Sequence, residues 1–257
     1  MDLLRAAAHD RAMPPPPPRL ALVGDRSPEV RAHARIPALV AACCDEGNEP
    51  IEPYWLASSD VAAEEDVMGF DGIWVVPGSP YRSSAGVLSA IGAARRNGIP
   101  LFGTCGGFQY LLVEYARNVC GLGAAAHAEE DPDAEAPLIA PLSCSLRGEE
   151  ASVLVAPETR AAALLGAGAS TERFFCSYGL APDYGATLAA HGLVISAADN
   201  AGSARIVELP GHPFYLATLF QPELSSDPSW VHPLIVGFLD AVRTHAATGT
   251  EVAAVLP

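Results

Sequence analysis

The chain has 257 residues, 50% of them hydrophobic, which is enough apolar material for one domain with its own core. Fifteen Lys and Arg against thirty Asp and Glu give a formal net charge of -15, which opposes binding to nucleic acids and to anionic membranes. The six cysteines show no paired CxxC spacing, so neither a disulfide framework nor a zinc site is expected. We expect a cytoplasmic, single-domain protein without a metal, a cofactor, or a nucleic-acid or membrane partner.

The two ends of the chain differ in composition from the middle. Residues 1–13 lack the apolar stretch of a secretory signal. The five prolines of residues 14–18 favour an extended polyproline II conformation, either as a stiff spacer or as a ligand for a proline-reading domain. The sequence therefore predicts a disordered Pro-rich tail over 1–18, a domain over 19–247 and a C-terminal tail over 248–257.

In the first half, short apolar stretches alternate with helical patterns. Strands are predicted at residues 20–23, 51–56, 72–76 and 99–103, and helices at residues 30–40, 87–96 and from 108 onward. This alternation predicts an α/β fold with a mostly parallel sheet flanked by helices, whose ligands bind at the carboxyl ends of the strands.

The second half of the sequence is less regular. Its predicted strands are residues 152–155, 174–177, 205–209 and 214–220, and a closing helix is predicted over residues 232–246.

Cys105 stands between a predicted buried strand and a predicted helix, with Gly103, Gly106 and Gly107 around it. A nucleophile on a sharp strand-to-helix turn needs small neighbours of this kind. The N-terminus of the following helix favours the thiolate, and the amide of Gly106 can face a developing oxyanion. The pattern indicates a nucleophilic cysteine; the alternative is a buried, inert cysteine beside glycines that packing requires.

Four blocks, at residues 20–25, 76–80, 103–119 and 212–223, together resemble the glutaminase domain of CTP synthase, in the class I glutamine amidotransferase superfamily. The sequence is most similar to a branch described as related to the CTP synthase C-terminal region, which includes selenoproteins. The resemblance implies a flavodoxin-like fold and cysteine-based amide hydrolysis.

By position, the resemblance assigns roles to six residues: Cys105 as nucleophile, Ser79 and Gly106 as oxyanion donors, Gln109 and Glu129 in the substrate pocket, and Glu223 as the acid of the triad. No phosphate loop of the GxxxxGK[ST] type occurs. CTP synthesis by this chain alone is therefore not expected.

The family's triad histidine is replaced by Gln221. An amide cannot accept and return a proton, and losing such a base typically costs about 10² to 10⁴ in rate. His127, close to Glu129, is the candidate substitute base, although it can equally be a structural histidine. Only Arg173 lies near the place where the family holds the carboxylate of glutamine with an arginine.

Two further cysteines, Cys144 and Cys176, could approach the site from the second half or be buried and inert. Three functions stay open for the whole chain. The first is a cysteine-dependent hydrolase of a small amide or amidine that need not be glutamine. The second is a glutaminase that passes ammonia to a separate synthetase partner, and the third is a catalytically silent ligand-binding protein. A homo-oligomer is also compatible with the sequence.

Overall fold

The structure, a computed structural model, describes residues 16–44 and 50–255. One large sheet comprises β1 (Arg19–Val23), β2 (Glu52–Leu56), β3 (Gly72–Val75), β4 (Leu101–Thr104), β6 (Glu150–Val155), β7 (Gly168–Arg173), β9 (Val194–Ala198), β10 (Ala204–Glu208) and β11 (Tyr215–Thr218). Its order is β2-β1-β3-β4-β11-β10-β9-β6-β7. Pairing is parallel from β2 to β11 and antiparallel from there to β7. A small separate sheet pairs β5 (Ile139–Pro141) with β8 (Tyr178–Leu180).

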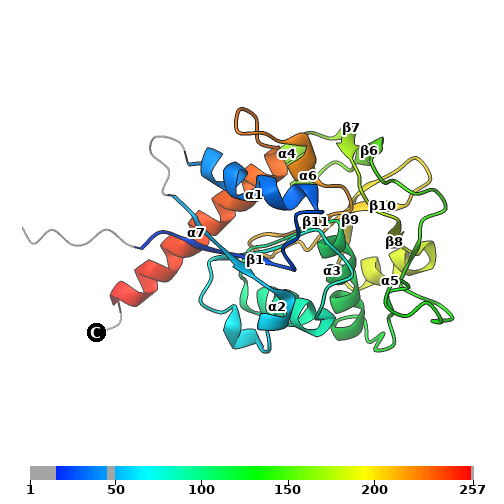
Figure 1. Cartoon of the computed structure of the whole chain (residues 1–257), viewed down its shortest axis with the longest axis horizontal. Coiled ribbons are helices and arrows are strands. Elements are labelled where there is room, and N and C mark those ends of the chain that lie inside the picture. Colours follow the sequence, from blue (N-terminus) through cyan, green and yellow to red (C-terminus); the bar gives the residue numbers. More distant parts are fainter. Residues whose placement is uncertain (1–15, 45–49, 256–257) are drawn as a thin grey trace, which may run out of the picture.

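Helices cover both faces of the large sheet, as Figure 1 shows, with α2 and α3 on one side and α1 and α7 on the other. The helices are α1 (Arg31–Ala42), α2 (Ser84–Asn97), α3 (Gly106–Asn118), α4 (Arg160–Leu165), α5 (Gly185–Ala190), α6 (Pro222–Ser225) and α7 (Pro233–Val255). Three short 3₁₀ turns lie at Ser58–Asp60, Glu64–Asp66 and Pro182–Tyr184. The expected α/β fold, with a mainly parallel sheet between helices, is confirmed. Among the described residues, no helix has both the length and the apolar character required to cross a membrane.

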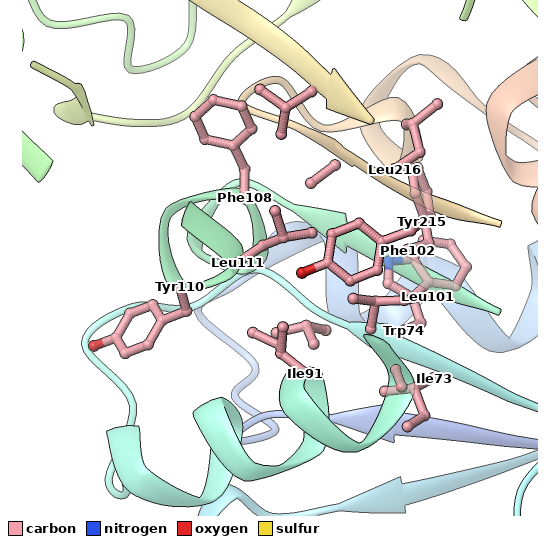
Figure 2. Packing of buried hydrophobic residues seen from close by; sticks show 14 of the residues in the cluster. Ile73, Trp74, Ile91, Leu101, Phe102, Phe108, Tyr110, Leu111, Tyr215 and Leu216 are labelled. Carbon is pink, nitrogen blue, oxygen red and sulfur yellow. The ribbon is translucent and has the colours of Figure 1, made fainter. Parts of the chain in front are cut away.

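The core lies on both faces of the central strands, because each face is covered by helices. Trp74 and Phe102 are fully buried and contact the ring of Phe238 on α7, with centroid distances of 5.9 and 5.5 Å. Figure 2 shows the side chains of α2 and α3, including Ile91 and Leu111, packed over the strands. These contacts explain why β3 and β4 are buried along their whole length.

The N-terminus of α3 lies unusually close to the sheet. A Cβ atom on Gly107 would lie 2.3 Å from the carbonyl oxygen of Val75, and one on Gly103 would lie 2.9 Å from the backbone of Gly107. Side chains at these two positions would overlap with backbone atoms. The glycines around Cys105 therefore determine how deeply the helix is seated on β3 and β4.

Several predicted elements differ from the structure. The strand predicted at residues 174–177 is wrong, because β7 ends at Arg173 and the backbone then turns to bond with the segment before β6, where Phe174 N–H donates to Glu149 O. Helix α7 continues to Val255, past residue 246 where the predicted closing helix ends, since no proline interrupts that stretch. Most of the predicted N-terminal tail, residues 1–15, lies outside the described residues. The weakly patterned β5, β7, β8, β9, α4, α5 and α6 were not predicted.

We expect Gly107→Ala to destabilise the fold by about 1–3 kcal/mol or more, because the added methyl group overlaps with a backbone carbonyl that cannot move away freely. Gly123→Ala is the matched control, since a Cβ atom there meets nothing within 4 Å, and it should change the stability by less than about 0.5 kcal/mol. Midpoints of urea denaturation measure both. Equal midpoints for the two variants would show that α3 does not need this close approach.

Candidate active site

Cys105 links the end of β4 to the start of α3 and has φ 54° and ψ −105°, a backbone conformation that non-glycine residues rarely adopt. Its N–H donates to Thr218 O at 2.8 Å, and its carbonyl accepts the N–H groups of Phe108 and Gln109. The strand–turn–helix geometry expected for this residue is present. Strained conformations of this kind cost about 1–3 kcal/mol and persist where the surroundings enforce them.

Two neighbouring side chains lower the pKa of the Cys105 thiol. Hydrogen bonding with Cys176 is the largest influence, and hydrogen bonding with Gln221 acts in the same direction against the opposing effect of burial. The pKa of Cys176 is raised, first by this same hydrogen bond and then by burial. The pair therefore favours a thiolate at Cys105 and a protonated thiol at Cys176.

Gln221 occupies the position before α6 at which the resemblance places a histidine. Its side chain is only 4% exposed and lines the same pocket as Cys105. Gln221 N–H donates to Arg173 O at 2.9 Å, so the backbone holds the residue in place. At this position the protein has an amide that can donate a hydrogen bond to the sulfur but cannot carry a proton between groups.

Glu223 is fully buried behind the elbow. Its Oε1 accepts a hydrogen bond of 2.6 Å from Thr104 Oγ1, which in turn accepts one from Trp74 Nε1 at 3.2 Å. Its Oε2 has no hydrogen-bond partner among the described residues. Burial raises the pKa of this carboxyl to about 7, against the smaller effect of the Thr104 hydrogen bond. Glu223 is therefore partly protonated at neutral pH.

His127 lies behind Gln109 and is not among the residues that line the pocket. Its Nε2 donates to Gln109 Oε1 at 3.0 Å, since that oxygen can only accept, and its Nδ1 accepts the N–H of Glu129 at 3.2 Å. Gln109 Nε2 then donates to Tyr178 O at 2.9 Å. Burial lowers the pKa of His127 to about 4, so the imidazole is neutral and fixed in one tautomer at physiological pH.

A pocket of about 530 Å³ opens over the elbow. Of the residues predicted for the site, Cys105, Ser79, Gln109, Glu129 and Gln221 line it. Glu129 Oε2 is buried without a hydrogen-bond partner among the described residues, and burial raises the pKa of this carboxyl. The structure thus brings together most of the predicted residues around one cavity, whereas Gly106, Glu223 and His127 are not among the residues that line it.

Arg173 is directed elsewhere: its Nε donates to Glu150 Oε1 at 2.8 Å and its Nη1 to Leu224 O at 3.2 Å. The cationic side chains that line the pocket are Arg31 and Arg147, and the Arg147 guanidinium stacks 4.5 Å from the ring centroid of Phe175. Neither arginine was predicted. No local pattern marks them, because they come from the start of α1 and from the loop before β6.

Cys176 also lines the pocket, whereas Cys144 is exposed and does not. The sequence left the two equivalent, because nothing local distinguishes them. Long-range contacts do: Cys176 Sγ lies 3.8 Å from Leu219 O, at the end of β11. The described residues contain no group of three His, Cys, Asp or Glu side chains suited to a metal ion.

Comparison with known proteins gives a consistent result. A family model described as Glutamine amidotransferase class-I matches residues 48–241. The CTP synthase of Halobacterium salinarum is 36% identical over 238 residues, which are 88% of this chain and 43% of that protein. The CTP synthase of Pelotomaculum thermopropionicum is 38% identical over 208 residues, 76% of this chain and 39% of that protein. The chain thus spans less than half the length of these relatives.

Two solved structures share the fold. The glutaminase domain of Trypanosoma brucei CTPS with bound acivicin has a TM-score of 0.81 at 24% identity and covers 88% of this chain and 94% of its own. A putative GMP synthase protein from Thermoplasma acidophilum has a TM-score of 0.57 at 13% identity and covers 92% of this chain and 98% of its own. Since the family model matches most of the chain, including the elbow at Cys105 and most residues that line the pocket, the chain belongs to the class I glutamine amidotransferase family.

Proposed function

We propose that this protein is a cysteine-dependent hydrolase or amidotransferase-like enzyme that attacks the C–N bond of a small amide or amidine, with Cys105 as nucleophile. The observation that carries the proposal is a sulfur held on a strained elbow inside a pocket, and the lowered pKa of the Cys105 thiol beside Cys176 and Gln221 supports it. Such a group adds to an electrophilic carbon to form a covalent intermediate, which water then hydrolyses.

The negative charge that develops on the substrate oxygen needs fixed donors. We propose the backbone amides of Ser79 and Gly106, which lie next to each other: a Cβ atom built on Gly106 would be 3.1 Å from Ser79 N. The Ser79 N–H makes no hydrogen bond among the described residues, and the Gly106 N–H is directed at the Cys105 sulfur. Both amides are therefore available where a tetrahedral intermediate on Cys105 would form.

Glu223 acts on Cys105 through its charge. When Glu223 is ionised, it opposes formation of the Cys105 thiolate, so the active combination is a neutral Glu223 with an ionised Cys105. A carboxyl whose pKa is about 7 can hold a proton at neutral pH. We propose that Glu223 stores this proton and that the family's Glu–His relay is interrupted at Gln221.

Two observations favour glutamine hydrolysis as a second candidate. The pocket combines the carboxylate of Glu129 with the guanidinium groups of Arg31 and Arg147, an arrangement that suits the ammonium and carboxylate groups of an α-amino acid. The chain also covers 94% of a solved glutaminase domain. Ammonia from glutamine would pass to a separate synthetase partner. A silent ligand-binding protein is the third candidate and predicts no chemistry at Cys105.

A screen of small amides, amidines and glutamine for ammonia release tests the proposal. We expect at least one substrate to be turned over, with activity lost in Cys105→Ala and retained in Cys144→Ala, because Cys144 is exposed and lies outside the pocket. Turnover of glutamine at about 1 s⁻¹ or faster would favour the second candidate. Release that persists in Cys105→Ala would contradict a role as nucleophile, and no release from any compound would favour the silent binding protein.

Glu223→Gln should alter the pH dependence of stability. The folded protein holds the Glu223 proton up to about pH 7, whereas the unfolded chain releases it near pH 4.5. Between these values the folded state binds more protons, so stability falls as pH rises and then levels off. The variant lacks this loss, which amounts to roughly 3 kcal/mol. Its Tm relative to wild type should rise between pH 4.5 and 7, and a pH-independent difference would refute the raised pKa.

His127 is predicted to act by positioning Gln109 rather than by exchanging protons. His127→Leu removes the donor to Gln109 Oε1 and should raise KM about tenfold, by the loss of one hydrogen bond to a buried polar group. His127→Gln, whose Nε2 can donate, should restore much of the loss. The pH profile of kcat should keep its midpoints in both variants. If kcat of His127→Leu no longer falls at low pH, and His127→Gln does not restore activity, His127 would instead be the missing base.

A further inference from the structure

The backbone brings Cys105 and Cys176 together from the two halves of the chain. Cys105 Sγ lies 3.6 Å from the carbonyl oxygen of Phe175, which belongs to the peptide unit that joins Phe175 to Cys176. The end of β11 contacts both cysteines, since Thr218 O accepts the N–H of Cys105 and Leu219 O accepts the thiol of Cys176. Cys105 and Cys176 both line the pocket at this point.

The chemistry of the two thiols is complementary. Cys105 is the more acidic partner, because the neighbouring Cys176 side chain lowers the pKa of Cys105 whereas the pKa of Cys176 is raised. Reactive thiolates are the sites at which peroxides oxidise cysteine, and a neighbouring thiol resolves the product. Both residues are free thiols that line the pocket, so a small oxidant can reach them even though each is only 5–6% exposed.

We propose that Cys105 and Cys176 form a peroxide-reactive dithiol site that closes to an intramolecular disulfide. The Cys105 thiolate attacks one peroxide oxygen, the O–O bond breaks, and Cys105 becomes a sulfenic acid while the other oxygen leaves as hydroxide or alkoxide. The Cys176 sulfur then attacks the sulfenic sulfur, an S–S bond forms, and the departing hydroxide takes the Cys176 proton to leave as water. Cysteine sulfur loses two electrons and the peroxide gains them.

The disulfide would remove the sulfur that the proposed hydrolysis requires and would be reversed by thiol exchange with a reductant. This inference goes beyond the proposed function, because it needs no amide substrate and holds even if the chain hydrolyses none. Cys144 provides an internal comparison, since it is exposed yet does not line the pocket.

The experiment treats the reduced full chain with hydrogen peroxide at neutral pH and maps its peptides by mass spectrometry without reduction. We expect a cross-linked peptide pair joining Cys105 to Cys176, loss of iodoacetamide labelling at both residues, and recovery of both labels after dithiothreitol. The same disulfide should form in Cys144→Ser. Absence of this cross-link in the folded wild-type protein, or a dominant cross-link between other cysteines, would overturn the proposal.

A second measurement defines the order of the steps. Cys176→Ser lacks the resolving thiol, so its Cys105 sulfenic acid should accumulate and be trapped by dimedone, whereas wild type should show little trapping. Circular dichroism checks that the variant is folded, and Cys176→Ala replaces it if it is not. Dimedone adducts that form mainly at Cys176 in Cys105→Ser, and at neither residue in the Cys176 variants, would refute Cys105 as the oxidised site.

Discussion

The close approach of the α3 N-terminus to the sheet is the constraint on which the site depends. At Gly107 the helix backbone leaves no room for a Cβ atom beside the carbonyl of Val75, so the turn between β4 and α3 must be as sharp as it is. Cys105 takes the strained backbone conformation of that turn, and its sulfur is therefore presented to the pocket and not to the core. The core packs against β4 on both faces, and this packing helps to hold the strained conformation.

Gln221 stands where the resemblance places a histidine, and the groups next to the Cys105 sulfur are neutral. In a histidine-containing triad the imidazolium stabilises the thiolate; here the thiol of Cys176 and the amide of Gln221 lower the pKa of the Cys105 thiol. Glu223 is left without a partner for Oε2 among the described residues, and burial keeps its pKa near neutrality. The two effects are linked, because a carboxyl that remained ionised in this place would weaken the thiolate that the donors favour.

The irregular second half of the chain builds the wall of the pocket opposite the elbow. Phe175 and Cys176 belong to the connection between β7 and β8, Tyr178 begins β8, and Arg147 reaches the same cavity from the loop before β6. These residues determine what can bind above Cys105. Arg147 contributes a positive charge, the carbonyl of Tyr178 orients Gln109, and Cys176 contributes a second thiol. The parallel half supplies Cys105 and its elbow, whereas the antiparallel half and its loops supply Cys176 and Arg147.

The sequence by itself determined the alternating α/β pattern and the elbow at Cys105, because both depend on short-range features, buried runs and glycine spacing. The replacement of a triad histidine by Gln221 stays a prediction from a local motif. Only the tertiary structure decided which distant groups meet there. The contact of Cys176 with Cys105 and the entry of Arg147 into the pocket depend on backbone pairing between segments with weak local patterns, one of which was predicted as a strand and is a loop. The same holds for His127, whose neighbour Glu129 faces the pocket while its own ring is locked behind Gln109. The positions of these side chains are decided by long-range packing, which no single stretch of sequence encodes.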